Sequence, residues 1–126
     1  MDDPEKTITF YRDTLGLELR SDVAYGNGRW MSFGSSDQPE LQVTLSTPYS
    51  NPSVSPEDQK ALADLLAKGV LGFIVFTTDD VDKTFEQIQS SGAEVIQEPM
   101  DQQYGVRDCA FRDPSGNIVR FNQPKG

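Results

Sequence analysis

Histidine is absent from this chain of 126 residues, and cysteine occurs only once. Without imidazole, the chain lacks the side chain that most often serves as a catalytic base and as a ligand for transition metals. The single cysteine, Cys109, excludes an internal disulfide and fits a reducing compartment, so we expect a cytoplasmic protein. Because Cys109 has no histidine partner, we expect a small buried side chain and not a nucleophile.

Long apolar runs and clusters of basic residues are also missing. No stretch approaches the roughly 20 apolar residues that a membrane-spanning helix needs, and no charged-then-apolar leader marks the chain for export. The 11 Lys and Arg against 20 Asp and Glu give a net charge of -9, which opposes nucleic-acid binding. We therefore expect one globular unit with neither a nucleic-acid nor a membrane partner.

The chain does contain an internal repeat of helical character. The segment DDPEKTITFYRDTLG resembles DDVDKTFEQIQSSG, and a shift of 77 residues brings Asp3 onto Asp80. We predict two helices, each capped at its start by one of these aspartates and ended by a glycine, Gly16 or Gly92, in the left-handed conformation. The expected apolar stripes are Ile8, Tyr11 and Leu15 in the first helix, and Val81, Phe85 and Ile88 in the second.

Extended runs with period-two alternation surround both helices. The repeat continues in YGNGRWMSF (25–33) and YGVRDCAF (104–111), and the further runs are LELRSDVAY, ELQVTLS, GVLGFIVFTT, AEVIQEPM and NIVRFNQ. The second half therefore has the order strand–helix–strand–strand–strand, whereas the first half begins at its helix and lacks the leading strand. We expect an unpaired sheet edge in the first half, which dimerisation or strand exchange could cover.

One segment, residues 48–69, lies outside the repeat. It starts as a loop rich in proline, serine and asparagine, and Ser55 then caps a helix that has Pro56 at its first position. The apolar face of this helix is expected at Ala61, Leu62, Leu65 and Leu66. We interpret the segment as a lid or a packing element over the sheet.

A duplicated β-α-β-β-β unit with FYRDTLGLEL in its first half and FRDPSGNIVRF in its second resembles the vicinal oxygen chelate superfamily. This superfamily includes glyoxalases, bleomycin-resistance proteins and extradiol dioxygenases, and the resemblance runs from Asp2 to Gln123. It implies an α+β fold in which paired curved sheets surround a small-molecule cleft, often in a homodimer. We predict a single domain over 1–126 that consists of a first module (1–47), a linker loop and helix (48–69) and a second module (70–126).

The resemblance also implies where a metal would be held. Enzymes of this superfamily take ligands for a divalent metal from the first and last strands of each module. One of these positions lies on the absent leading strand, and the others fall on Phe73, Arg120 and Gln42. A guanidinium cannot be deprotonated in a protein, and within about 4 Å of a divalent cation it would be repelled by several kcal/mol. The sequence therefore predicts no metal and no other cofactor at the standard position.

The same strands supply the candidate ligand-binding residues. Strand alternation directs Arg120 into the cleft, where it pairs with an anionic group of the ligand, unless it is a surface arginine paired with one of the chain's own acids. Phe73 forms an apolar wall of the cleft or belongs to the ordinary core. Gln42 and Thr44 share one face of their strand, either as polar cleft residues or as part of a half-exposed outer face.

Three further residues are candidates. Trp30 and Arg107 each have two interpretations, and Tyr49 has one. Trp30, the only tryptophan, lines the cleft or packs in the core. Tyr49 lies in the loop before the linker helix, where it could close over a ligand. Arg107 is a cleft charge or, as we expect, a partner of Asp108 or Asp113 in a salt bridge.

Three functions agree with these patterns. We favour a metal-free protein of the glyoxalase and bleomycin-resistance family that binds a small molecule, an antibiotic or a metabolite, as a homodimer. The second possibility is a lyase or dioxygenase with an atypical metal site. The third is an interaction-only protein with a vestigial cleft, whose exposed sheet edge pairs with another chain. No catalytic residue is assigned, and whether the chain is an enzyme stays open, although the sequence favours binding.

Overall fold

The computed structural model describes residues 1–25, 28–49, 51 and 53–124. The described helices are α1 (Pro4–Ile8), which continues as the π-helical segment η1 (Thr9–Thr14), α2 (Pro56–Ala67) and α3 (Val81–Ser90). The described strands are β1 (Glu18–Tyr25), β2 (Gly28–Gly34), β3 (Val43–Ser46), β4 (Phe73–Thr77), β5 (Glu94–Asp101), β6 (Val106–Arg112) and β7 (Ile118–Pro124). Among these helices, none has both the length and the apolar character needed to cross a membrane.

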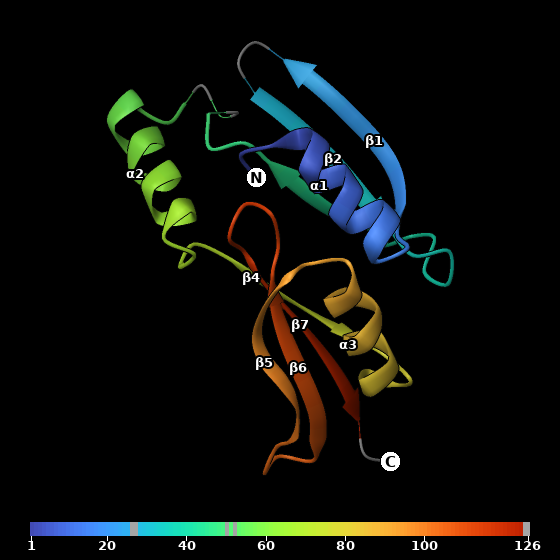
Figure 1. Ribbon diagram of the computed structural model, residues 1–126. Coiled ribbons are helices and arrows are strands. Elements are labelled where there is room, and N and C mark those ends of the chain that lie inside the picture. The colour runs from blue at the N-terminus through green and yellow to red at the C-terminus, as the bar shows by residue number, and fades with distance from the viewer. Residues whose placement is uncertain (26–27, 50, 52, 125–126) are drawn as a thin grey trace.

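The described strands form two sheets, one in each half of the chain (Figure 1). The first sheet has the order β1-β2-β3, and the second has the order β4-β7-β6-β5. Neighbouring strands are antiparallel except β4 and β7, which are parallel. The second half is therefore a β-α-β-β-β unit and the first half an α-β-β-β unit, which confirms the α+β fold predicted from the repeat.

The two halves differ at the outer edge of β3. In the second half, β4 lies along β7 with Thr77 beside Asn122, and the N–H of the next residue, Thr78, donates to the carbonyl oxygen of Asn122 at 2.8 Å. The repeat shift places Met1 at the position of Thr78, and the amino group of Met1 donates to the carbonyl oxygen of Ser46, also at 2.8 Å. None of the described strands lies along β3 on that side, so this edge is open, as predicted.

Both repeat helices begin and end as predicted. Asp3 and Asp80 each accept a hydrogen bond from the backbone N–H three residues later, at 3.1 Å. Such a cap contributes about 1 kcal/mol because it satisfies a donor that has no partner within the helix. Gly16 and Gly92 follow the helices with φ values of +79° and +90°, a conformation that favours glycine.

The hydrophobic core joins the repeat helices to the sheets. Its buried side chains are Met1, Phe10, Tyr11, Met31, Phe33, Val81, Phe85, Ile88, Cys109, Phe111, Val119 and Phe121. Cys109 is fully buried here, as predicted. Phe10 is buried beside Tyr11, although the predicted stripe omitted it. The helix widens over η1, where the N–H of Leu15 donates to the carbonyl oxygen of Phe10 at 2.9 Å, and this wider turn directs two consecutive side chains into the core.

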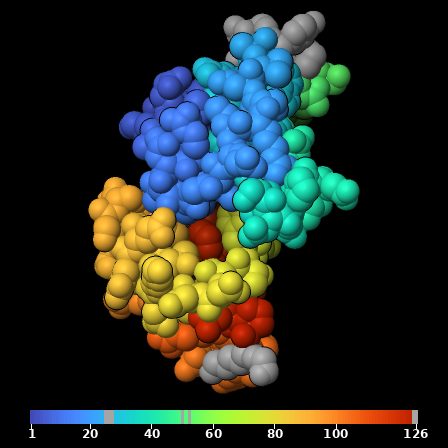
Figure 2. Space-filling view, turned by 90° about the vertical axis from the view of Figure 1, so that its right-hand side faces the viewer, coloured from blue at the N-terminus to red at the C-terminus, as the bar shows by residue number. Residues whose placement is uncertain are grey.

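Hydrogen bonds between the modules hold them together. The hydroxyl of Tyr11 donates to Oδ2 of the buried Asp113 at 2.7 Å, and the N–H of Asp2 donates to the hydroxyl of Ser115 at 2.9 Å. Gln87 of α3 donates to a carbonyl oxygen at the end of η1 at 3.1 Å. Figure 2 shows the result, with the first module (blue) stacked on the second (yellow to red).

The linker helix α2 lies beside the first sheet (Figure 1). Two of its apolar side chains, Leu62 and Leu66, line a cavity of about 320 Å³ together with Met1 and residues of β3, among them Leu45. Leu66 is buried, whereas Leu65, which was expected on the same apolar face, is 39% exposed. Leu62 and Leu66 thus face the edge of the first sheet across this cavity, and the role of the segment as a lid or a packing element stays a prediction.

The strand β3 is shorter than predicted, since it begins at Val43 and not at Glu40. The guanidinium of Arg20 explains the difference, because it donates hydrogen bonds to carbonyl oxygens of the preceding loop, those of Ser35, Pro39 and Leu41. These carbonyl groups are therefore not available to a longer ladder with β2. Gln42 consequently lies outside the strand, where it is exposed.

Candidate functional site

Each sheet has one face against its helix and one face that no repeat helix covers, which we call its open face. Strand register arranges the open face of the second sheet in rows: Val75, Arg120, Ala110 and Gln97 lie side by side in one row, and Thr77, Asn122, Asp108 and Met100 in the next. Val119 and Phe121, which alternate with these residues along β7, are buried in the core. Arg120 therefore points to the open face, as alternation predicted.

Five polar side chains on this face form a connected network, the Asp108 cluster, made of Gln97, Gln102, Tyr104, Asp108 and Arg120. Asp108 lies at its centre and is 1% exposed. Its Oδ1 accepts hydrogen bonds from the amide nitrogens of Gln97 at 2.7 Å and Gln102 at 2.9 Å. Its Oδ2 accepts one from the hydroxyl of Tyr104 at 3.2 Å and lies 3.2 Å from Nη1 of Arg120. The same Nη1 donates to Oε1 of Gln97 at 2.9 Å, which closes the network.

The cluster holds its central carboxylate in the ionised form. Burial raises the pKa of the Asp108 carboxyl, but hydrogen bonds from Gln102 and Gln97, the charge of Arg120 and the hydroxyl of Tyr104 together bring that pKa below its usual range. Desolvation and the nearby Asp108 charge raise the pKa of Tyr104, so its hydroxyl stays a donor. Asp108 is therefore an anion at neutral pH and compensates the positive charge of Arg120.

Large apolar side chains are exposed around this polar network. Phe73 is 73% exposed, Val75 and Met100 are each 46% exposed, and Tyr104 is 71% exposed. Soluble monomers rarely leave several large apolar side chains exposed side by side unless that surface contacts a ligand or a partner. The open face of the second sheet thus combines an apolar surface with a few fixed polar groups, which is typical of small-molecule sites.

The open face of the first sheet carries two of the other candidate residues. Trp30 lies opposite Ser46 in the register of β2 and β3, and Thr44 lies opposite Ser32. The hydroxyl oxygens of Ser32 and Thr44 are 2.8 Å apart, so these two side chains bond each other. Gln42, just before β3, adds an exposed amide next to this face.

Tyr49 lies apart from both open faces. It is half-exposed and lines a cavity of about 420 Å³ between the N-terminus, the end of β3 and α2. The structure therefore brings Phe73 and Arg120 together on one sheet and Trp30 and Thr44 together on the other. That these residues bind a ligand stays a prediction.

Sequence reasoning missed four members of the Asp108 cluster. Gln97, Gln102 and Tyr104 lie in and after β5, outside the strands from which the superfamily draws its ligands, so nothing singled them out. Asp108 did offer a signal, because it stands at a position that alternates with the apolar residues Cys109 and Phe111 within the same strand. A carboxylate on the open face of a strand needs a partner there.

Arg107 forms a salt bridge, as expected, but not with the expected residues. Its guanidinium contacts Asp82 of α3 at 2.9 Å and Asp101 at 3.6 Å. The prediction of Asp108 or Asp113 as the partner is wrong, because consecutive strand residues point to opposite faces and because Asp113 is occupied by Tyr11 and the turn that follows it.

The side chains at the superfamily's metal positions do not fit a divalent cation. Phe73 offers no donor atom, and the guanidinium of Arg120 is a cation held by Asp108 and Gln97. Within the described part of the chain, no group of three or more acidic or cysteine side chains is arranged to hold a metal ion. The nearby Asp108 carboxylate is already engaged by Gln97, Gln102, Tyr104 and Arg120, so it does not stand free as an oxygen ligand for a metal.

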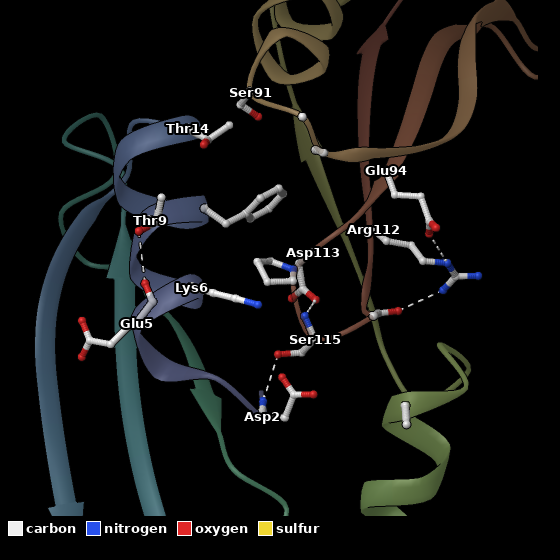
Figure 3. A pocket seen from close by; sticks show the side chains of 16 residues that line it. Asp2, Glu5, Lys6, Thr9, Thr14, Ser91, Glu94, Arg112, Asp113 and Ser115 are labelled. Atoms are coloured by element: carbon white, nitrogen blue, oxygen red, sulfur yellow. Dashed lines mark hydrogen bonds and ion pairs between the residues drawn. The ribbon is translucent and has the colours of Figure 1, made fainter.

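A separate cavity of about 770 Å³ lies between the two modules (Figure 3). Figure 3 shows Lys6 pointing into it from the first helix and Arg112 bordering it from the second module. Arg112 is held by Glu94 at 3.0 Å and by the carbonyl oxygens of Gly69 and Gly116. None of the six predicted ligand-binding residues is among its lining, and Asp2, Asp113 and Ser115 of that lining make hydrogen bonds between the modules, so we assign it to the module junction.

Comparison with known proteins identifies the family. The model of the Glyoxalase/Bleomycin resistance protein/Dioxygenase superfamily matches residues 1–121. The crystal structure of UcmS2 is similar to this chain with a TM-score of 0.81 and 32% sequence identity, over 95% of this chain and 89% of that one. TnmS3, described as an antibiotic binding protein from Streptomyces sp. CB03234, is similar with a TM-score of 0.69 and 28% identity, over 98% of this chain and 88% of that one.

A relative from Bacillus subtilis (strain 168), the uncharacterized protein YraH, is 27% identical to this chain, over 96% of this chain and 90% of its own length. The family model, the two-module fold and these relatives agree with the resemblance noted in the sequence. This chain belongs to the glyoxalase/bleomycin resistance protein/dioxygenase superfamily.

Proposed function

We propose that this chain is a metal-free binding protein for a small molecule, an antibiotic or a metabolite, and that the ligand lies on the open face of the second sheet. The observation that carries this proposal is the Asp108 cluster, a closed polar network set among exposed apolar side chains. Fixed polar groups orient a ligand and apolar side chains supply most of its binding free energy. The description of the similar protein TnmS3 as antibiotic binding supports the same class of ligand.

The absence of a fitting donor set supports the metal-free part of the proposal. The residues at the superfamily's metal positions offer a benzyl ring (Phe73), a compensated guanidinium (Arg120) and a single amide (Gln42), which together do not make a donor set for a Lewis-acid metal that polarises a carbonyl. We therefore propose binding without chemical conversion.

A homodimer completes the site in this proposal. A small-molecule site usually buries most of its ligand, whereas an open sheet face covers only one side of it. A second copy supplies the other wall, and the exposed Phe73 and Val75 and the open edge of β3 are surfaces that such a contact covers.

Fluorescence titration with N-phenyl-1-naphthylamine, a neutral aromatic dye, tests the proposal. We expect saturable binding that Phe73→Ala weakens about tenfold, because a buried aromatic side chain contributes roughly 1.5–3 kcal/mol. Leu65→Ala, which removes an exposed apolar side chain from α2, is the matched control and should leave the affinity unchanged. The proposed site would be contradicted if Phe73→Ala bound the dye as tightly as the unaltered chain, or if the unaltered chain did not bind the dye.

A further inference from the structure

Arg120 is the cation of the Asp108 cluster that would attract an anionic ligand, and its charge is already compensated. Its Nη1 lies 3.2 Å from Oδ2 of Asp108 and donates to Gln97 at 2.9 Å. Gln97 in turn donates to Oδ1 of Asp108 at 2.7 Å, so the three side chains hold one another in place. Asp108 is almost completely buried, and a ligand that displaced it from Arg120 would leave a buried carboxylate without its main counter-charge.

The second arginine of this sheet with the same orientation is compensated as well. Arg112 pairs with Ile118 in the register of β6 and β7, two residues from Arg120 along β7, and Glu94 contacts its Nε at 3.0 Å. The remaining polar members of the Asp108 cluster are two amides and a phenol. The polar surface offered to a ligand therefore carries hydrogen-bonding groups and almost no net charge.

We propose that Asp108 determines the charge selectivity of this face, so that it accepts flat, uncharged aromatic molecules and rejects anionic ones. This inference rests on the proposed function and adds the ligand class and the residue that sets it. Phe73, Val75 and Met100 supply the apolar surface for the rings. The N–H groups of Arg120 that neither Asp108 nor Gln97 engages can donate to a carbonyl or hydroxyl oxygen, since a guanidinium has five such donors. Asp108 acts here as a positioning residue, because it works through Arg120.

Two dyes with the same ring system test this selectivity. N-phenyl-1-naphthylamine is neutral, and 8-anilinonaphthalene-1-sulfonate differs from it by one sulfonate. Dissociation constants are measured at about 0.5 M salt, where long-range repulsion by the net charge of the chain is screened. We expect the unaltered chain to bind the neutral dye at least about tenfold more tightly than the sulfonate, the loss expected when a charged group meets no free counter-charge.

Asp108→Asn then removes this preference. The variant keeps the shape of the side chain but frees the charge of Arg120, and we expect its affinity for the sulfonate to rise at least about tenfold. The readout is the ratio of the two dissociation constants, which should shift by at least about tenfold towards the sulfonate. The double variant Asp108→Asn/Arg120→Gln removes the freed charge and should lose the gained sulfonate affinity.

Asp82→Asn is the matched control. Asp82 also holds an arginine, Arg107, at 2.9 Å, but on α3, away from the open face. This variant changes the net charge equally and removes the nearer of the two carboxylates that contact Arg107, which keeps its contact with Asp101 at 3.6 Å. A gain in sulfonate affinity equal to that of Asp108→Asn would overturn the inference. Thermal unfolding of each variant confirms that the dyes meet folded protein. If Asp108→Asn does not fold, equal affinity of the unaltered chain for the two dyes still overturns the inference.

The outcomes separate the two proposals. Equal affinity of the unaltered chain for both dyes would overturn the charge selectivity and leave the proposed binding function in place. No binding of either dye would overturn the proposed function and the selectivity with it. Both proposals are supported if the unaltered chain binds the neutral dye more tightly than the sulfonate and only Asp108→Asn gains affinity for the sulfonate.

Discussion

Arg107 and Asp108 are neighbours in the chain, yet their side chains act on opposite faces of β6. Arg107 reaches Asp82 on the helix side, and Asp108 meets Arg120 on the open side. The period of two along a strand separates them, so adjacency of opposite charges in a strand sequence is poor evidence for a salt bridge between them. The partner of each charge is set by the residue across the sheet or on the packed helix.

The low pKa of Asp108 makes its contribution to stability depend on pH. Because its pKa in the folded state lies below the value of about 3.9 expected in the unfolded chain, its contribution is fully present above about pH 4 and is lost as the pH falls through the folded-state pKa. We expect Asp108→Asn to lower the free energy of unfolding by about 1–3 kcal/mol at pH 7. This difference should shrink below about pH 4, where the carboxyl of the unaltered chain becomes protonated.

Urea unfolding at several pH values measures this difference. Glu57→Gln, which neutralises an exposed carboxylate on α2, serves as the control and should change stability little at any pH. A cost of Asp108→Asn that stayed constant from pH 7 to pH 3 would contradict the charge-based role of Asp108.

Cys109 should be chemically inert while the protein is folded. Burial raises the pKa of its thiol to about 11, so little thiolate is present near neutral pH. We expect iodoacetamide at pH 8 to modify Cys109 at least about a hundredfold more slowly in the folded protein than in urea. Similar rates in both states would show that this part of the core opens readily.

At the level of elements, the repeat made most of the fold predictable. Two aspartate caps and two glycine ends located both repeat helices, and alternation located the strands to within a few residues. Two elements differ from the prediction, because hydrogen bonds from a distant side chain or within the helix backbone overrode the sequence pattern. Arg20 binds loop carbonyl groups and shortens β3, and the π-helical turns of η1 bring Phe10 into the core. Neither effect has a periodic signature.

The candidate site was less predictable than the fold. Alternation directed Arg120 to the open face, but the identity of its partner depends on the register between β6 and β7, which places Asp108 beside Asn122 and one row from Arg120. Gln97 joins them through a register shift in the pairing of β5 with β6. A single sequence does not reveal such a shift.

The contact between Tyr11 and Asp113 should decide how firmly the two modules are joined. Tyr11→Phe removes the donor of a buried 2.7 Å hydrogen bond, although Asp113 keeps its bonds to the following turn. We expect a loss of about 1–2 kcal/mol in the free energy of unfolding. Tyr49→Phe removes the same hydroxyl from a half-exposed side chain and should cost less than about 0.5 kcal/mol. Equal midpoints of chemical denaturation for the two variants would show that the junction does not depend on this bond.

At the scale of the whole molecule, the open faces predict self-association. Sedimentation equilibrium should give twice the 14.0 kDa mass of the chain, because the open faces expose large apolar side chains that a partner covers. Val75→Lys places a charge among them and should shift the equilibrium towards the monomer and weaken dye binding together. A monomer that binds the dye with full affinity would contradict a shared site.

Removal of metal ions should leave binding unchanged, since the side chains at the superfamily's metal positions do not fit a divalent cation. The affinity for N-phenyl-1-naphthylamine should agree within about twofold before and after dialysis against EDTA. A site that needed a metal would instead lose most of its affinity. Recovery of binding only on addition of a divalent metal would contradict the proposal.

The position of the ligand is the central claim, and an NMR titration of the ¹⁵N-labelled chain with N-phenyl-1-naphthylamine tests it most directly. We expect the largest shift changes at the amides of Phe73, Val75, Asp108 and Arg120 and at the side-chain amide of Gln97. Changes confined to Lys6, Thr9 and Ser91, around the cavity between the modules, would contradict the account and assign binding to the junction instead.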